Sequence, residues 1–303
     1  MDKPIRVSRR SVLLAGLGAL AAACAPTAAA PQSSPGTRPG TSSTAGQITP
    51  IVAASDIAVG TNQRFLFAAI GSDNRPITDA TVELAFFKLT GPSTAQLRSR
   101  APAVYRESPG APDRGVYVAR TDFDEAGDWG VAAQVSRAGR EPTELRASFQ
   151  VKAQSATPSV GAAVPASRTL TGTTPEEIER FCSARPPDHF HQLSIADAIL
   201  QPKPLVVLFA SPSFCTSRTC GPSLEVLGAL ETQYGNGANY IHVEIYRDGH
   251  PGERGEMVPA VTEWGLPSEP WLFVVDANGQ LVDKFEGSIT VEEVGTALAR
   301  VLA

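Results

Sequence analysis

Apolar and polar residues alternate along much of the first half of the chain, from residue 48 to residue 152. Alternation with a period of two is typical of strands with one buried face, and turn residues interrupt it about every ten positions, as in all-β domains. The pattern predicts a β-sandwich. Its expected strands include 64–70, 80–87, 115–119, 129–135 and 145–151.

The pattern changes after residue 173, where helical spacing and short apolar runs alternate. Thr174, Pro175 and Glu177 have the spacing of a capping box with proline at the first helical position, so a helix should begin there. The apolar run 204–210 is typical of a central parallel strand. Further helices are expected at 193–200, from near Gly221 onward and at 290–302, with strands at 239–246, 271–276 and 280–287. This order predicts an α/β domain.

Two stretches consist mostly of Ala, Ser, Thr, Pro and Gly and cannot bury enough apolar surface to offset the entropy of ordering them. We expect the first to be a flexible tether and the second to link two domains. The predicted organisation is a leader at 1–24, a tether at 25–47, a β-sandwich at 48–152, a linker at 153–173 and an α/β domain at 174–303.

The leader carries an export pattern. Arg9 and Arg10 form a twin-arginine motif, and a short apolar stretch follows them. The stretch ends in Leu20-Ala21-Ala22-Ala23-Cys24, which resembles a bacterial lipoprotein cleavage site, although the leucine lies four residues before the cysteine instead of three. The resemblance implies export and lipidation at Cys24, so the mature protein would be anchored to the outer face of the cell membrane.

Cys215 and Cys220 lie between the apolar run and the next helix, in the sequence FCTSRTCGP. Pro222 is tolerated only in the first turn of a helix, so Cys220 is expected near the N-cap. There the helix dipole favours thiolate over thiol and lowers the pKa of the cysteine. In an exported protein this placement indicates a redox pair. We expect Cys220 to attack and Cys215 to act as the resolving thiol.

The order of these elements, the Cys-Gly-Pro at the helix start and the later segment Glu269-Pro270-Trp271-Leu272-Phe273 resemble the thioredoxin superfamily. The resemblance implies a cis peptide before Pro270 and places Glu269 and Pro270 at the border of the active site. In the first half, the sequence GVYVARTDFDEAGDW at 115–129 resembles immunoglobulin-like modules of bacterial envelope proteins. The expected fold is thus an N-terminal all-β immunoglobulin-like sandwich followed by a C-terminal α/β thioredoxin-like domain.

Two departures from the thioredoxin pattern matter for the chemistry. Four residues separate the cysteines here, whereas the usual motif has two. Counting from the strand would therefore make Cys215 the first cysteine of the family, and counting from the helix selects Cys220. Val207 occupies the strand position at which thioredoxins carry a buried aspartate, so Glu269 or His242 would have to assist proton transfer instead.

Cys182 is left over and is an inert packing residue, a partner in a disulfide or redox relay, or a metal ligand. His189 and His191 lie close to it in sequence. With Cys215 and Cys220 they could form a soft copper site, since copper-delivering relatives of thioredoxin use two cysteines and a histidine.

Three functional classes follow. The first is a membrane-tethered thiol-disulfide oxidoreductase, without a cofactor, that acts on envelope proteins with disulfides or thiols and is recharged by a separate redox partner. The second is a copper-binding or metallochaperone-like protein. The third is a non-catalytic adaptor with a structural disulfide. The formal net charge of −5 argues against a nucleic-acid partner.

Overall fold

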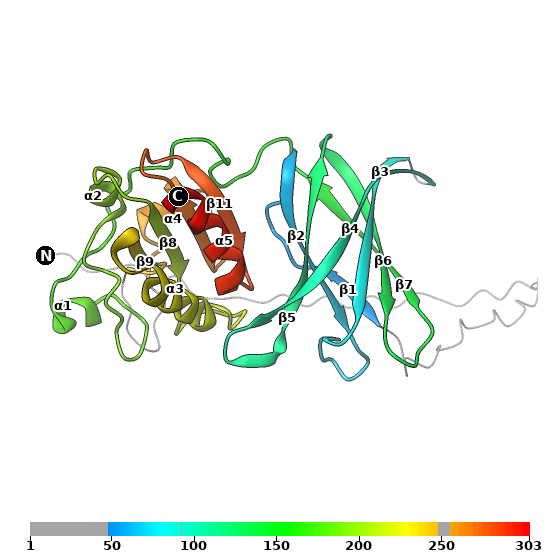
Figure 1. The fold of residues 1–303 in the computed structure, drawn as a ribbon, viewed down its shortest axis with the longest axis horizontal. Helices are drawn as coiled ribbons and strands as arrows, with labels where there is room; N and C mark the ends of the chain where they lie inside the picture. The colour runs from blue at the N-terminus through cyan, green and yellow to red at the C-terminus, as the bar shows by residue number, and fades with distance from the viewer. Residues whose placement is uncertain (1–47, 92, 248–254) are drawn as a thin grey trace, which may run out of the picture. The chain divides into compact units, whose positions relative to one another are not determined.

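The computed structural model describes residues 48–91, 93–247 and 255–303 (Figure 1). The predicted leader at 1–24 with its Cys24, and the predicted tether at 25–47, lie outside the described residues. Within the described ranges no helix combines the length and the apolar character needed to cross a bilayer.

The first half is all-β, as predicted. Seven strands pair antiparallel in one continuous sheet with the order β1-β2-β5-β4-β3-β6-β7. The strands are β1 (Thr49–Val52), β2 (Gly60–Ile70), β3 (Thr81–Gly91), β4 (Thr94–Ser108), β5 (Ala111–Phe123), β6 (Gly127–Ser136) and β7 (Thr143–Val151).

Strand β4 explains why this sheet is continuous instead of two separate layers. Its first part pairs with β3, up to the Val82–Ala103 partners, and its last part pairs with β5, beginning at Val104 and Val118. A strand that changes partners in this way forms a corner between two halves of a sheet. A parallel bridge between Ala58 and Lys152 joins the two ends, so the sheet is barrel-like.

Aromatic side chains fill the interior of this sheet. The rings of Phe65 and Phe86 meet edge to face at 4.9 Å, and Phe123 contacts Phe86 and Trp129 in the same way. All four side chains are buried. Each such ring contributes about 1.5–3 kcal/mol by leaving water, and edge-to-face pairs add to this, so the aromatic cluster is a main source of stability.

The second half contains a four-stranded sheet with the order β11-β10-β8-β9 (Figure 1). Strands β8 and β9 are parallel, whereas β10 runs antiparallel to both β8 and β11. The strands are β8 (Leu205–Ala210), β9 (Asn239–Glu244), β10 (Trp271–Val275) and β11 (Leu281–Glu286); the helices are α1 (Pro175–Glu179), α2 (Ile195–Ile199), α3 (Cys220–Tyr234), α4 (Pro259–Glu263) and α5 (Val291–Leu302), with a 3-10 turn η1 (Gly235–Gly237) after α3.

Helices pack on both faces of this sheet. Val206 and Leu208 of β8 share a buried cluster with residues of α3 and α5, while Val207 and Phe209 share another with residues of α2 and α4. Because successive residues of a strand point to opposite faces, a fully apolar β8 is what a sheet covered on both sides requires.

The segment expected to be a linker, 153–173, runs along β11. Gly161 and Val164 donate backbone hydrogen bonds to the carbonyls of Leu281 and Gly279, and Leu281 donates one back to Ala162. Val164 is buried in the core beside α2. These contacts could not be predicted from the composition of the segment, because they are made mostly by the backbone.

Candidate functional site

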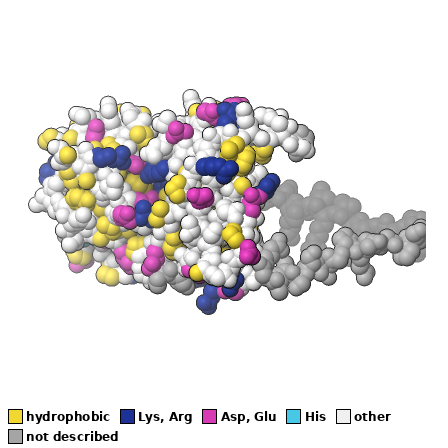
Figure 2. Space-filling view, turned by 45° about the vertical axis from the view of Figure 1, so that its right-hand side comes forward, with side chains coloured by type: hydrophobic (Ala, Val, Ile, Leu, Met, Phe, Trp, Pro, Cys, Tyr) yellow, Lys and Arg dark blue, Asp and Glu magenta, His cyan; other side chains and the backbone are white. Residues whose placement is uncertain are grey.

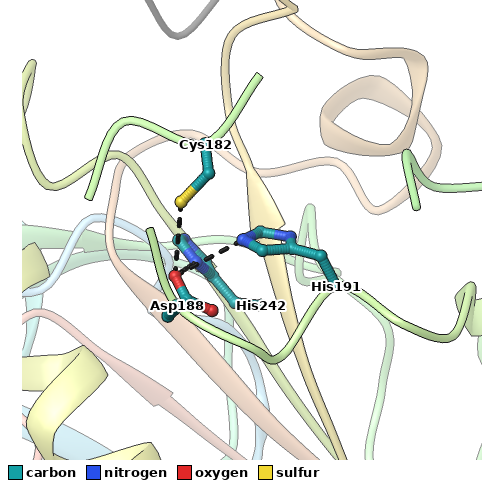
Figure 3. A group of neighbouring side chains, drawn as sticks. All are labelled: Cys182, Asp188, His191 and His242. Carbon is teal, nitrogen blue, oxygen red and sulfur yellow. Dashed lines mark hydrogen bonds and ion pairs between the residues drawn. The ribbon is translucent and has the colours of Figure 1, made fainter. Parts of the chain in front are cut away.

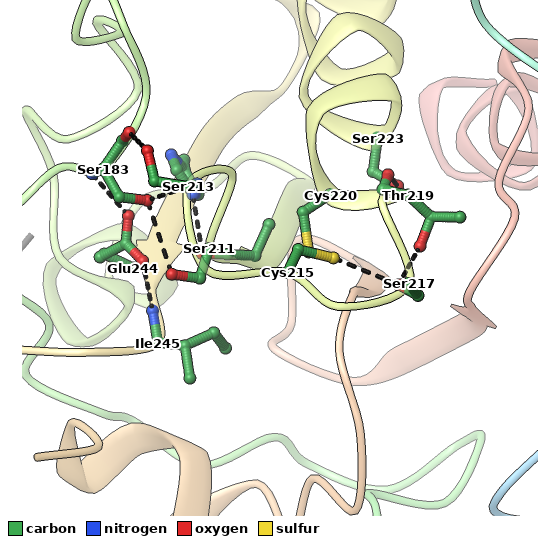
Figure 4. The surroundings of a disulfide bond; sticks show 12 residues. Ser183, Ser211, Ser213, Cys215, Ser217, Thr219, Cys220, Ser223, Glu244 and Ile245 are labelled. Carbon is green, nitrogen blue, oxygen red and sulfur yellow. Dashed lines mark hydrogen bonds between the residues drawn. A yellow bond between two sulfur atoms is a disulfide. The ribbon is translucent and has the colours of Figure 1, made fainter. Parts of the chain in front are cut away.

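Cys215 and Cys220 are joined by a disulfide, as predicted, with their Cα atoms 6.0 Å apart (Figure 4). Strand β8 ends at Ala210, and the amides of Phe214 and Cys215 then donate to the carbonyl of Ser211 at 3.0 and 2.9 Å. This tight turn holds Cys215 just beyond the strand. Helix α3 begins at Cys220, one residue before the expected start.

The two sulfur-bearing residues differ in access. Cys220 is 0% exposed and belongs to the core between the sheet and helices α3 and α5. Cys215 is half-buried, and its Sγ lies 3.2 Å from the exposed hydroxyl of Ser217. Cys220 does occupy the first turn of the helix, but its burial argues against the attacking role expected for it. The helix dipole influences the pKa of a thiol, whereas access decides which sulfur a protein substrate can reach.

The first amides of α3 have no side-chain cap and can stabilise a negatively charged sulfur. Its N-cap residue, Thr219, makes no side-chain capping bond, and its hydroxyl instead interacts with Ser217 at 2.8 Å. No capping side chain therefore competes for the first amides of the helix, whose partial positive charge stabilises a thiolate.

Glu269 and Pro270 lie where the resemblance implied. The Glu269–Pro270 peptide is cis, and β10 begins directly after it. A carboxylate oxygen of Glu269 and the sulfurs of Cys215 and Cys220 all lie within 4.8 Å of one another. The pair therefore has a carboxylate as a close neighbour.

The other two positions considered for proton transfer lie elsewhere. Val207 is fully buried in the cluster with α2 and α4, whereas Cys220 is in the cluster on the opposite face of the sheet. His242, on β9, belongs to a separate group of polar side chains. Among these candidates the structure leaves Glu269 as the titratable group beside the sulfurs.

That separate group, which we call the Cys-His cluster, consists of Cys182, Asp188, His191 and His242 (Figure 3). Its members converge on one oxygen, Oδ2 of Asp188. The Sγ of Cys182 lies 3.3 Å from this oxygen, Nδ1 of His242 lies 2.8 Å from it and Nε2 of His191 lies 3.4 Å from it. Cys182, His191 and His242 are each at most 1% exposed. The leftover thiol is thus neither exposed nor surrounded only by apolar groups.

Opposite charges shift the ionisation of the Cys-His cluster. Burial by itself would lower the pKa of His242 and of His191, but the carboxylate of Asp188 outweighs it, and the pKa of His242 is raised well above its usual value. Burial would also raise the pKa of Asp188 and of Cys182, yet the two histidines hold both below their ordinary values. The cluster therefore favours charged groups inside the protein.

The copper set considered from the sequence is not assembled. His191 belongs to the Cys-His cluster, and the exposed His189 pairs with Glu231 at 2.8 Å. Cys215 and Cys220 have Glu269 as their neighbour instead. Sequence reasoning missed Asp188, although it lies in the same short segment as Cys182 and His191, and the pairing of β9 that brings His242 to them is not visible in the sequence.

Charged side chains are mixed on the face drawn in Figure 2, where basic and acidic groups alternate with hydrophobic ones. Such a mixture gives this face no strong field of one sign.

No family model matches the chain, and no curated protein does. Solved structures with partial similarity include a thiol:disulfide interchange protein of the thioredoxin family from Chlorobium tepidum TLS, at 13% identity over 47% of this chain and 98% of that chain, with a TM-score of 0.31. The exposed lipoprotein thioredoxin Etrx1 from Streptococcus pneumoniae strain TIGR4 is 18% identical over 33% of this chain and 86% of its own, with a TM-score of 0.26. CopC from Methylosinus trichosporium OB3b is 12% identical over 35% of this chain and 94% of its own, with a TM-score of 0.23.

The α/β architecture of the second half rests on its own features. These are the strand order β11-β10-β8-β9, the disulfide at the start of α3 and the cis peptide before β10.

Proposed function

We propose that the protein is a thiol-disulfide oxidoreductase whose redox pair is Cys215 and Cys220. The observation that carries this proposal is a disulfide at the start of a helix in which one cysteine is half-buried and the other fully buried. An exchange reaction needs one sulfur that substrates can reach and a second that stays close to it. A purely structural disulfide does not need this asymmetry.

In the reduced protein, the thiolate of Cys215 attacks one sulfur of a substrate disulfide. The substrate S–S bond breaks, its leaving sulfur takes up a proton, and a mixed disulfide forms. Cys220 then loses its proton, with the carboxylate of Glu269 as the acceptor, and attacks Sγ of Cys215. The second substrate sulfur leaves as a thiolate and takes up the proton held by Glu269, so two electrons have passed from the pair to the substrate. Oxidation of a substrate dithiol is the same sequence in reverse.

The setting of this reaction is also part of the proposal. The twin-arginine motif and Cys24 support export and attachment to the membrane by a lipid. The substrates would then be envelope proteins with disulfides or thiols, and a separate redox partner would restore the pair after each cycle.

Reduction of insulin by dithiothreitol, followed by turbidity, tests the proposal. The unchanged protein should accelerate it, and Cys215→Ser should abolish the acceleration because the reachable sulfur is gone. Cys220→Ser should lose turnover as well but should accumulate mixed disulfides. Equal activity of the unchanged protein and both variants would instead support the adaptor function, in which the disulfide only closes the loop.

A second candidate function is metal binding by the reduced pair. The observation that favours it is the carboxylate of Glu269 within 4.8 Å of both sulfurs. Cu(I) is one of the metals that soft thiolate ligands select. Titration of the reduced protein with Cu(I), compared with the Cys215→Ser variant, tests this function: tight binding that needs Cys215 supports it, and binding that does not need Cys215 contradicts it.

A further inference from the structure

We propose that the Cys-His cluster is a closed binding site for a zinc ion, independent of the redox pair. Its four side chains, Cys182, Asp188, His191 and His242, provide a sulfur, a carboxylate oxygen and two imidazole nitrogens. Zinc binds cysteine sulfur, histidine nitrogen and carboxylate oxygen, and its structural sites have four protein ligands in a tetrahedron. Calcium and magnesium prefer oxygen ligands, so the cysteine and the histidines argue against them.

The distances already suit a small ion. The ligand atoms of Cys182, His191 and His242 lie 3.3, 3.4 and 2.8 Å from Oδ2 of Asp188, and all four atoms lie within 4.8 Å of one another. Bonds of about 2.0–2.3 Å place neighbouring ligands of a tetrahedral zinc ion about 3.3–3.6 Å apart. Only a small movement of the side chains is therefore needed to bind the ion.

His242 is held in the orientation that a metal ligand needs. Its Nε2 lies 3.1 Å from the carbonyl oxygen of Ala210, so Nε2 carries the proton that it donates there. Once the ring is neutral, its free electron pair is therefore on Nδ1, which points into the cluster (Figure 3). Metal-binding histidines commonly donate their second nitrogen to a backbone carbonyl in this way.

His191 provides an independent observation. The residue is 1% exposed, and neither ring nitrogen has a hydrogen-bond partner among the described residues; Nε2 approaches Asp188 at 3.4 Å without forming a hydrogen bond. A buried polar atom without a partner is rare and needs a reason. A metal ion bound to Nε2 provides one.

Hydrogen bonding alone satisfies this cluster poorly. Oδ1 of Asp188 already accepts a hydrogen bond from the amide of Phe190. Oδ2 alone therefore faces the thiol of Cys182 and the imidazoles of His242 and His191. A carboxylate oxygen has about two lone-pair sites, one fewer than the groups around it. Zinc would replace this crowding with four bonds, and binding would release the proton of the Cys182 thiol and any extra proton on the imidazoles.

The ligands join two segments next to the redox loop, residues 211–219 between β8 and α3. Cys182, Asp188 and His191 lie in the connection between α1 and α2, and His242 lies on β9. Ser183, the neighbour of Cys182, accepts the amide of Ser213 at 3.3 Å in the turn that leads to Cys215 (Figure 4). A bound zinc ion would therefore hold the start of the redox loop, at Ser213, in place without contacting the sulfurs of Cys215 and Cys220.

The test uses the full chain with Cys24→Ser, Cys215→Ser and Cys220→Ser, which keeps Cys182 as its one thiol. The reduced, chelator-treated protein is titrated with Zn²⁺ against a chromophoric chelator, and with Co²⁺ followed by absorption. We expect one ion per chain, visible Co²⁺ bands of tetrahedral coordination, and a near-ultraviolet charge-transfer band, which can come only from the Cys182 thiolate. Weak or multiple binding, or cobalt binding without that band, would overturn the proposal.

Further variants locate the site. Loss of an outer-shell partner weakens metal binding about 10–100-fold, so Cys182→Ala and His191→Ala, which each remove a ligand, should weaken it at least about 100-fold. His189→Ala is the matched control, because this exposed histidine is outside the cluster, and it should leave the affinity unchanged. Full affinity in Cys182→Ala would contradict the proposal even if His191→Ala failed to fold.

Discussion

His242 connects the Cys-His cluster to the strand that leads to the redox loop. Its Nδ1 lies 2.8 Å from Asp188 and its Nε2 lies 3.1 Å from the carbonyl oxygen of Ala210, the last residue of β8. A single buried ring thus joins two polar regions of the domain that the sequence separates. The redox pair and the Cys-His cluster are distinct sites in the same domain, and they can be tested separately.

The first prediction concerns which sulfur reacts. In the reduced protein, iodoacetamide should modify Cys215 at least about tenfold faster than Cys220, since Cys220 is fully buried. Quenched alkylation followed by peptide mass mapping measures both rates. Faster modification of Cys220 would show that the helix dipole outweighs access, and the two roles would be exchanged.

The second prediction concerns Glu269. Replacement by Gln keeps the shape of the side chain but removes its ability to accept a proton, so disulfide reduction should slow by about 100-fold or more. The rate of mixed-disulfide formation should change less, because Cys215 attacks before the proposed transfer. Stopped-flow kinetics with a disulfide peptide separates the two steps. Equal slowing of both steps would indicate that Glu269 acts on substrate binding.

The third prediction concerns Asp56. Its buried carboxylate accepts hydrogen bonds from Lys152, Ser155, Ala156 and Thr157. Burial by itself would raise the pKa of Asp56, but these hydrogen bonds outweigh it and hold the pKa well below its usual range. Asp56→Ala should therefore lower the free energy of unfolding at pH 7 by about 2–4 kcal/mol.

The pH dependence of this loss has a definite sign. A depressed pKa gives stability that is present above the unfolded value of about 3.9 and is lost as the pH falls toward the folded value. The difference between the unchanged protein and Asp56→Ala should thus be full at pH 7 and shrink below about pH 4. Urea unfolding at several pH values measures it, and a difference that grew in acid would contradict the prediction.

The fourth prediction tests the strand position at which thioredoxins carry an aspartate. Val207→Asp places a carboxyl group among apolar side chains of the cluster with α2 and α4, away from Cys220. It should lower the free energy of unfolding by about 3–5 kcal/mol and should not increase activity. Val207→Ala controls for the loss of packing alone. A gain in turnover would show that the added carboxylate reaches the pair.

Local signals in the sequence were sufficient for several elements. The capping box of α1 forms as expected. The hydroxyl of Thr174 accepts a hydrogen bond from the amide of Glu177, and the carboxylate of Glu177 accepts one from the amide of Thr174. The apolar run that became β8 and the proline in the first turn of α3 were likewise sufficient, because each reflects a requirement within a few residues.

Other features depend on contacts between distant segments. Strand β4 was missed because most of its positions alternate only weakly and many are exposed, so its pairing with both β3 and β5 left no clear pattern. The difference in exposure between Cys215 and Cys220 depends on how α3 packs against the sheet. The Cys-His cluster needs β9 beside the loop of Asp188, where His242 donates its amide to Phe190.

The enclosure of Cys182 limits how the chain can oxidise. Three described cysteines could in principle pair in three ways, and a mixture of pairings would divide the protein into different covalent species. Cys182 is 0% exposed, and its sulfur faces Asp188 instead of another thiol. One pairing is therefore left among these three, so each round of oxidation of the folded chain returns a single product.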